Sequence, residues 1–338
     1  MHAILTIRGA AEVLKQELQE LGISANVEAP DWCSADLDSN QLQLVRLRSQ
    51  LAIRVLELIA AVAREELAAA AVAIKPSGSF CVRASGQDRQ ELEEELGAII
   101  HDTTGKPVNL TAPDTLYYVY ESSGKYLLGI DLYRDLAKRH YKIITGSQSL
   151  AGPVAAAALR ITGWTPKLDL VVWPCATGEL AIEAALSASK KSPRAYELKI
   201  LDEQKPECRI LAADPRLSMV RSSEKNAKVA GVHQHIRFSR QDADWLDTKH
   251  DEAGVQVMAG LLPNLKLQPK LAKEIVYQLD FILSKDGKAG FVCVNEDSAA
   301  LLEREAASYK LSRQYIWSGK QALTIVLLQK IKTEETKG

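Results

Sequence analysis

The sequence predicts an α/β protein whose C-terminal half is a doubly wound parallel sheet, preceded by smaller α+β regions. From residue 168 onward, strand-like apolar runs alternate with longer helical patterns, which is typical of parallel strands joined by crossover helices. The last two strand-like segments, 313–317 and 322–329, flank Ser318-Gly319-Lys320 and predict an antiparallel pair at the end of the sheet. Residues 1–145 mix short strands and helices without this regular order, which indicates a different architecture there.

The C-terminal half divides into elements by apolar periodicity. Apolar runs bounded by loops predict the strands, and apolar residues at helical spacing predict the helices between them. The predicted strands cover residues 168–172, 209–213, 235–239, 255–259 and 289–294, and the predicted helices cover 179–188, 217–230, 267–283 and 298–309.

The N-terminal 60 residues predict a small α+β unit. Strands are expected at 3–7 and 26–29, with a helix over 11–21 that stops at Gly22. Residues 51–60 are apolar and rich in β-branched side chains, so a strand is expected there, although a helix is also compatible with the pattern.

Residues 61–145 predict a second α+β region. Its elements are strands at 80–84, 116–120 and 126–132 and an amphipathic helix over 89–101. The tetrad Ser122-Ser123-Gly124-Lys125 predicts the turn between the last two strands. The small, polar stretch 144–152 is the best domain boundary in the chain.

Composition narrows the class of protein. The chain has 338 residues, is 46% hydrophobic and 25% charged, and carries a net charge of −1, so bulk charge does not attract nucleic acid. The five cysteines stand singly, with no metal-ligand spacing, so no metal site is expected. We expect no membrane span, because the apolar stretches are short, and a cytoplasmic protein without a signal peptide.

The residues that point most specifically to a ligand follow the first three predicted strands of the C-terminal half, 168–172, 209–213 and 235–239. The first strand runs into Cys175, Ala176, Thr177 and Gly178, a small-residue loop before a helix, where backbone can approach a ligand. Asp214 ends the second strand and can accept both hydroxyls of a ribose. Asp242 and Ala243 follow the third strand, where a carboxylate can accept an adenine amino group. In this order, the residues predict a pocket for an adenosyl group.

The same stretches resemble the THUMP-containing RNA methylases, a family that methylates the exocyclic amine of guanine in tRNA or rRNA. The resemblance rests on Pro-Cys-Ala-Thr-Gly-Glu-Leu-Ala-Ile-Glu-Ala-Ala-Leu at 174–186, on the stretch from Asp214 to Val232, and on the leading helix at 151–164. In the N-terminal half it rests on residues 80–84, 109–114, 128–132 and 136–141.

The resemblance implies a domain order, a cofactor and a partner. We expect a ferredoxin-like subdomain at 1–60, a THUMP-type RNA-binding domain at 61–145, a linker and leading helix at 146–167, and a Rossmann-like methyltransferase domain at 168–332. The implied cofactor is S-adenosylmethionine, and the implied partner is structured RNA, above all tRNA. The cations expected to face RNA are Lys125, Lys138, Arg139 and Lys142, among several tyrosines.

The chain departs from the family at the positions nearest the chemistry. Trp173 stands where an Asp is usual, and Glu179 follows the loop that is usually rich in glycine. After the fourth strand the family carries Asn- or Asp-Pro-Pro-Tyr, which orients the amine and stacks on the flipped base. Here Leu261 takes the Asn position, so Pro263 and Asn264 are the remaining catalytic candidates.

Three functions follow from these observations. The first is an active RNA methyltransferase that uses S-adenosylmethionine. The second is a catalytically inactive RNA-binding protein that keeps the methyltransferase fold, which the departures at Trp173, Glu179 and Leu261 favour. The third is a small-molecule methyltransferase, against which the THUMP resemblance argues. Fold alone does not separate the first two.

Overall fold

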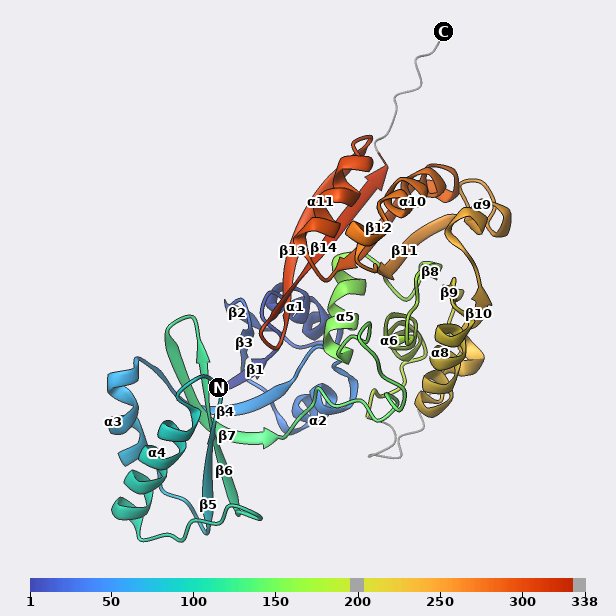
Figure 1. Ribbon diagram of the computed structural model, residues 1–338. Helices are drawn as coiled ribbons and strands as arrows, with labels where there is room; N and C mark the ends of the chain where they lie inside the picture. Colours follow the sequence, from blue (N-terminus) through green and yellow to red (C-terminus); the bar gives the residue numbers. More distant parts are fainter. Residues whose placement is uncertain (195–203, 331–338) are drawn as a thin grey trace. The chain divides into compact units, whose positions relative to one another are not determined.

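The computed structural model describes residues 1–194 and 204–330 and divides into two compact units (Figure 1). The first unit comprises Met1–Thr6, Leu14–Arg46 and Ala52–Leu136, and the second comprises Ile7–Val13, Leu47–Leu51 and the described part of Ala137–Gly338. Residues 331 and 332, the end of the expected methyltransferase region, lie outside the described residues. Among the described residues, no helix has the length and apolar character needed to cross a bilayer.

The first unit is built on one seven-stranded sheet in the order β2-β3-β1-β4-β7-β6-β5. The long strand β4 (Arg54–Val62) pairs antiparallel with β1 (His2–Leu5) on one side and with β7 (Lys125–Tyr133) on the other. The remaining strands are β2 (Asn26–Ala29), β3 (Trp32–Ala35), β5 (Phe80–Ala84) and β6 (Thr115–Ser122). The boundary expected at residue 60 therefore falls inside a strand, and the two N-terminal regions share a sheet.

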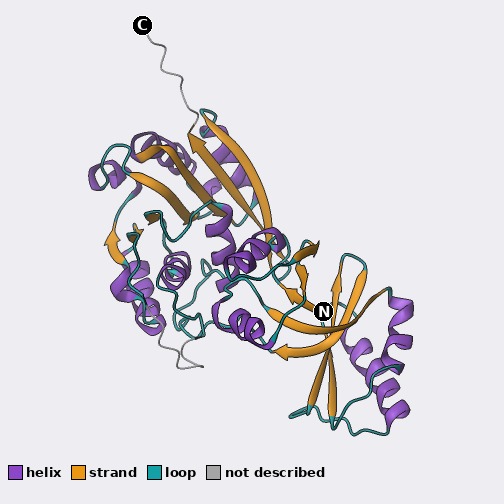
Figure 2. Ribbon diagram, turned by 180° about the vertical axis from the view of Figure 1, so that it is seen from behind, coloured by secondary structure: helices purple, strands orange, loops and turns teal. Residues whose placement is uncertain are grey.

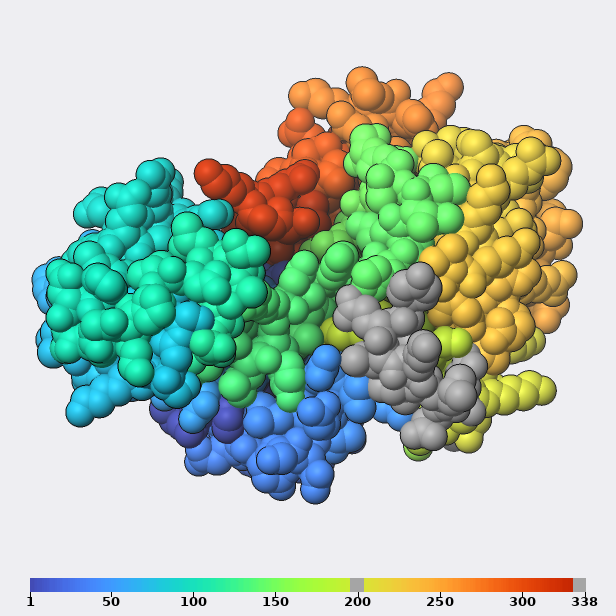
Figure 3. Space-filling view, turned by 90° about the horizontal axis from the view of Figure 1, so that it is seen from below, coloured from blue at the N-terminus to red at the C-terminus, as the bar shows by residue number. Residues whose placement is uncertain are grey.

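Two helices cover one face of this sheet (Figure 2). The helices α3 (Leu67–Val72) and α4 (Arg89–Thr104) bury Leu67, Leu92 and Leu96 against strand residues such as Phe80. Helix α4 ends at Gly105, whose φ of 66° is the left-handed conformation that commonly terminates a helix. Residues of the α4 region, cyan to teal, lie on the face that Figure 3 shows. The other N-terminal helices are α1 (Ala11–Glu20) and α2 (Ser39–Arg48).

The second unit holds the predicted doubly wound sheet, in the order β10-β9-β8-β11-β12-β14-β13. Five strands run parallel, and β14 (Gln321–Lys330) pairs antiparallel with both β12 (Leu283–Cys293) and β13 (Tyr309–Ser318). The other strands are β8 (Leu170–Val172), β9 (Ile210–Asp214), β10 (Arg237–Arg240) and β11 (Val255–Leu261). The α/β fold class and its terminal antiparallel hairpin are confirmed.

The helices of this unit lie on both faces of its sheet. Parallel crossovers are right-handed, so α6 (Glu179–Ala188) and α8 (Leu217–Ala230), which link successive strands in one direction, share a face. The chain then returns across the opposite face from β10 to β11. Residues 241–254 of this return contain only the short helix η3 (Ala243–Trp245) and the four-residue α9 (Leu246–Lys249). The longer helices α10 (Pro269–Ile282) and α11 (Glu296–Glu305) follow, and α5 (Gly152–Ile161) precedes the sheet.

Candidate functional site

Predicted cofactor residues from two neighbouring strands meet at the carboxyl edge of the second sheet. Strands β8 and β9 are parallel neighbours, so the loop after β8 lies beside Asp214 at the end of β9. The backbone N–H of Ala176 donates a hydrogen bond to Asp214 Oδ2 at 3.1 Å. Ala176 and Gly178 both have positive φ, 48° and 96°, so the loop keeps a tight turn although an alanine replaces one glycine. The residues that the sequence pattern singled out are therefore close in space.

The carboxylate of Asp214 is fully enclosed by protein. Its Oδ1 accepts hydrogen bonds from the backbone N–H and the Nε of Arg216, at 2.9 and 3.2 Å, and its Oδ2 accepts from Ala176. Asp214 is 0% exposed. The N–H of Gly178 is also engaged, since it donates to the carbonyl of Cys175 at 2.9 Å. The N–H groups of Ala176 and Gly178 and the carboxylate of Asp214 therefore all have hydrogen-bond partners within the chain.

Trp173 fills the interior directly after β8. It is 1% exposed and belongs to the same buried cluster as Ala213, Ala243 and Leu262. Its indole Nε1 donates to the carbonyl of Gln241 at 2.9 Å, so the ring is held at both its apolar body and its polar tip. A large aromatic side chain thus lies among residues from the ends of the second, third and fourth parallel strands.

Glu179 is buried at the start of α6. The hydroxyl of Thr177 donates to its two carboxylate oxygens, at 2.8 and 2.9 Å, and the hydroxyl of Ser149 donates to Oε1. The Nζ of Lys142 lies 4.0 Å from Oε1. The carboxylate is favourably placed with respect to the helix dipole, which explains how the buried charge is tolerated.

The segment before α5 is tied to this loop. The side chain of Asn226 on α8 accepts from the N–H of Ile144 and donates to the carbonyls of Ile144 and Thr177, at 3.0, 2.9 and 2.9 Å. Arg216 reaches Gln148 Oε1 at 2.6 Å. Residues 144–149 are therefore bonded to α8, to α6 and to Arg216 after β9, and Asn226 of α8 links them to the loop.

These contacts decide whether the residues fit S-adenosylmethionine. In the family pattern the ribose binds Asp214, whose carboxylate here accepts three protein donors and is fully buried, so ribose hydroxyls would reach it only after the surrounding groups move. Glu179 places a buried carboxylate at the start of α6, and this charge would repel a methionine carboxylate docked at that helix end. The indole of Trp173 lies among the buried residues beneath the same edge. In the described geometry, Asp214, Glu179 and Trp173 are all enclosed by protein at the position that the family pattern implies for the cofactor.

The other predicted site residues lie apart from this closed group. Asp242 is partly exposed, and its Oδ2 lies 3.7 Å from Arg240. Asn264 caps the short helix η4 (Leu265–Leu267), with its side chain accepting the N–H of Lys266 at 3.1 Å. Pro263 is half-buried beside it, and Leu261 is buried. Asn264 is therefore occupied as a helix cap in this structure.

Arg139 corrects the expected set of RNA-facing cations. It is buried, and its Nε donates to Glu183 Oε1 at 2.7 Å, with both side chains 0% exposed. The hydroxyl of Tyr141 and the amide of Gln50 also bond Glu183, at 2.8 and 2.7 Å. Burial and the nearby Glu183 raise the pKa of Tyr141 well above its usual value. Arg139 is thus a buried ion-pair partner of Glu183, and its side chain is not placed to contact RNA.

The three predicted lysines differ in availability. Lys125, in the first unit, and Lys138, in the second, are exposed. The Nζ of Lys142 donates to the carbonyl of Leu150 at 2.6 Å, so this lysine holds the segment before α5.

A basic pocket in the first unit was not anticipated from the sequence. Its volume is about 320 Å³, and its lining includes Arg54, Arg83, Arg89 and Arg134 beside Tyr118. The guanidinium of Arg54 lies 3.8 Å from the centre of the Tyr118 ring and pairs with Asp131. Arg83 and Arg89 pair with Glu93 at 3.1 and 3.0 Å. These arginines come from three separate stretches of the sequence, so no local pattern reveals them.

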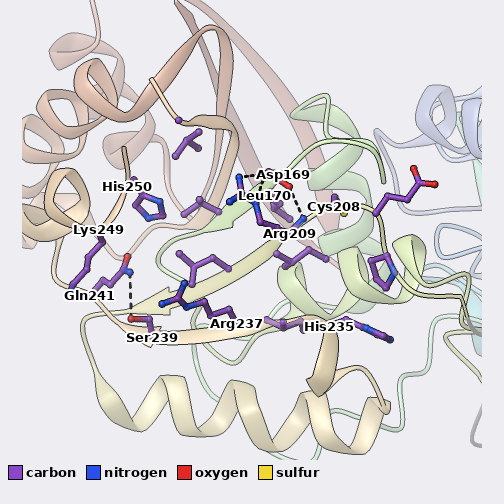
Figure 4. Close-up of a pocket in the computed structure, with 18 of the residues that line it drawn as sticks. Asp169, Leu170, Cys208, Arg209, His235, Arg237, Ser239, Gln241, Lys249 and His250 are labelled. Atoms are coloured by element: carbon purple, nitrogen blue, oxygen red, sulfur yellow. Dashed lines mark hydrogen bonds and ion pairs between the residues drawn. The ribbon is translucent and has the colours of Figure 1, made fainter. Parts of the chain in front are cut away.

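A larger cavity, of about 690 Å³, opens on the second unit's sheet (Figure 4). It runs along strands β8, β9 and β10, on the face away from α8, and reaches from Asp169 and Arg209 to Gln241. No residue of the loop 173–178 lines it. The lining contains none of the predicted cofactor residues, although Gln241 at its end donates its backbone N–H to the carbonyl of Asp214 at 3.2 Å.

Comparisons with known proteins show what this chain is similar to. Residues 139–266 match a family model described as "RMKL-like, methyltransferase domain". The ribosomal RNA large subunit methyltransferase K/L of Alteromonas mediterranea is 30% identical over 286 residues, covering 71% of this chain and 41% of that protein. The tRNA (guanine(6)-N2)-methyltransferase of Methanocaldococcus jannaschii is 26% identical over 170 residues, covering 44% of this chain and 45% of that protein. The chain thus spans less than half the length of these relatives.

A solved structure extends the likeness of fold to nearly the whole chain. The structure of SMU.472 complexed with SAH matches with a TM-score of 0.76 and 16% identity, over 98% of both chains. At this identity, the match supports the fold. These matches confirm the resemblance to S-adenosylmethionine-dependent RNA methyltransferases and the fold class that the sequence predicted, with residues 139–266 similar to an RMKL-like methyltransferase domain.

Proposed function

We propose that this chain is an RNA-binding protein on a methyltransferase fold whose own side chains close the family's cofactor position. One observation carries the proposal: Trp173, in place of the usual Asp, is buried in the cluster that lies beneath the ends of the parallel strands. A fully buried indole with a satisfied N–H is a stable arrangement that a cofactor would have to displace.

The catalytic loop supports the same proposal. Methylation of an exocyclic amine requires an acceptor that aims the amine lone pair at the methyl group. Leu261 has no such group, and the side chain of Asn264 already accepts the N–H of Lys266. The chain thus lacks a described acceptor at the family's position, as well as an open cofactor position.

Binding of structured RNA is supported by the relatives' named substrates and by the arginine pocket of the first unit. Arginine binds phosphate in a planar, bidentate manner and stacks on rings, so this pocket suits an RNA backbone. The two acids around it, Glu93 and Asp131, leave an excess of positive charge among its arginines. We propose that phosphates contact Arg83, Arg89 and Arg134 and that Lys125 extends the same surface.

Calorimetric titration of the full chain with S-adenosylmethionine tests the closed cofactor position. We expect no saturable heat up to about 1 mM ligand, which corresponds to about −4 kcal/mol of binding free energy. The Asp214→Ala variant should behave like the parent, because Asp214 serves only internal hydrogen bonds. Micromolar binding that Asp214→Ala abolishes would overturn this part of the proposal.

That opposite outcome defines a second candidate, an active RNA methyltransferase. It is favoured by the retained positive φ of Ala176 and Gly178 and by the placement of Asp214 beside them. Transfer of labelled methyl groups from S-adenosylmethionine to RNA would then establish it.

Retardation of RNA in gels tests the other half of the proposal, with tRNA and a large-subunit rRNA fragment as its two arms. Arg83→Ala combined with Arg134→Ala should weaken binding about tenfold or more and lower the slope of log K against log salt by about 1 to 2, since each phosphate contact contributes about 0.7 to 0.9. Arg304→Ala serves as the control, because Arg304 is exposed in the second unit and pairs only with its neighbour Glu305 among the contacts described. Unchanged binding in the double variant would exclude the arginine pocket as the contact.

A further inference from the structure

We propose that the second unit carries a nucleotide-binding site on the open face of strands β8, β9 and β10, with adenine as the preferred base. The site is the 690 Å³ cavity of Figure 4, a volume typical of pockets for small molecules. It is separate from the carboxyl-edge loop, so it does not depend on S-adenosylmethionine binding there.

The cavity exists because the connection between β10 and β11 is short. In this return, η3 and α9 together span seven residues, 243–249, which is too little helix to cover three strands. Residues 237, 239 and 241 alternate along and just beyond β10, so Arg237, Ser239 and Gln241 point to the same face. Figure 4 shows these three side chains, together with Lys249 and His250, around one end of the cavity.

Two buried polar atoms at this end have no partner. Gln241 is 3% exposed, and its Oε1 accepts no hydrogen bond, while its Nε2 donates only a long bond of 3.5 Å to Ser239 Oγ. The Nε2 of His250 is buried and also without a partner. Buried polar atoms are almost always hydrogen-bonded, so these two indicate a ligand that supplies the missing bonds.

The side chains that line the cavity indicate the kind of ligand, an adenine nucleotide. A carboxamide offers an acceptor and a donor side by side, which matches the amino group and N7 of adenine. Leu211, Val171 and Val255 provide an apolar floor for a planar ring. Arg237 and Lys249 stand at the same end of the cavity and suit a phosphate, whereas Arg209 is already paired with Asp169 at 2.6 Å. Asp251, also in the lining, disfavours a second anionic group.

Titration of the full chain with AMP tests the site. We expect saturable binding, with GMP about tenfold weaker, because guanine presents the wrong pattern at Gln241. Gln241→Met keeps the shape of the side chain and removes both polar groups, so it should weaken AMP binding about tenfold and abolish the preference over GMP. Arg237→Gln should weaken AMP binding more than it weakens adenosine binding.

Two control variants test whether AMP binds in this cavity and nowhere else on the second unit. Lys228→Gln, an exposed cation on α8 that does not line the cavity, should leave AMP binding unchanged. Asp214→Ala should also leave it unchanged, because only the backbone carbonyl of Asp214 contacts Gln241 and the substitution keeps that carbonyl, so the variant distinguishes this site from the carboxyl edge. A 5′-phosphorylated oligoadenylate that competes with AMP would identify RNA as the source of the nucleotide, whereas failure to compete would identify a free nucleotide.

The proposal is overturned if AMP gives no saturable heat up to about 1 mM, a ligand concentration that detects even weak binding. It is equally overturned if AMP and GMP bind alike, or if Lys228→Gln weakens binding as much as Arg237→Gln does. None of these outcomes bears on the RNA gel experiment or on the S-adenosylmethionine titration, so failure here leaves the proposed function to its own tests.

Discussion

At the scale of single residues, Trp173 shows how one substitution can change a site. Its indole is buried and bonded, whereas Trp245 in the neighbouring helix η3 is 52% exposed. Trp173→Ala should lower the free energy of unfolding by about 3–5 kcal/mol, because it leaves a large cavity and frees the carbonyl of Gln241. Trp245→Ala should change it by less than about 0.5 kcal/mol. Urea denaturation of both variants measures the difference, and equal losses would show that Trp173 does not fill the site.

Glu183 offers a second test at this scale. It is fully buried and accepts hydrogen bonds from Arg139, Tyr141 and Gln50. Glu183→Gln removes the charge that balances Arg139, and breaking such a buried pair costs about 3–5 kcal/mol. Asp297→Asn is the matched control, because the pair of Asp297 and Lys266 is exposed and should contribute less than about 1 kcal/mol. Thermal unfolding compares the two, and a stable Glu183→Gln variant would show that Arg139 finds other partners.

At the scale of elements, two glycines have opposite roles. A Cβ on Gly260 in β11 would meet the carbonyl oxygen of Trp173, a backbone atom that cannot move without shifting β8. Gly97, inside α4, has no such neighbour. We therefore expect Gly260→Ala to destabilise the protein by more than about 1 kcal/mol and Gly97→Ala to stabilise it by about 0.5–1 kcal/mol. Denaturant unfolding measures both, and a stable Gly260→Ala variant would contradict the close packing of β11 on the loop.

The elements also show what the sequence could predict. Helices α6 and α8 and strand β5 begin and end at the predicted residues, because apolar periodicity and flanking turn residues mark them clearly. Strand β4 confirms the strand expected at 51–60. Strand β3 and helix α2 were missed, because β3 has four buried residues without alternation and α2 buries only Val45. Strand β12 begins six residues before the prediction, since the exposed residues Lys285 and Asp286 interrupt its apolar run.

The sequence could predict where the candidate site lies, but not that side chains close it. Strand ends fix where Ala176 and Asp214 meet, and the sequence pattern identifies those ends. Whether side chains close that place depends on three-dimensional partners, such as Gln241 for Trp173 and Ser149 for Glu179. Arg139 illustrates the same limit, since a basic stretch alone does not show that one of its cations is buried against Glu183.

At the scale of the whole molecule, the reactivity of the cysteine thiols measures how tightly the interiors of both units are packed. All five cysteines are free and buried: Cys33, Cys81, Cys175, Cys208 and Cys293. Burial raises the pKa of four of them, to about 12 for Cys293 and well above the usual value for Cys175, so little reactive thiolate forms at pH 8.

An exposed-thiol assay turns this into a test. At pH 8 we expect an aromatic disulfide reagent to modify less than about one thiol quickly in the native protein, and all five in denaturant, because reaction requires both access and ionisation. Cys208, with 7% of its surface exposed, should react first, and Cys175, in the closed loop, should react later because burial raises its pKa well above the usual value. If Cys175 reacts before Cys208, the loop at the carboxyl edge opens more readily than the rest of its unit. The cofactor position would then be accessible in solution, and the second candidate function would gain over the first.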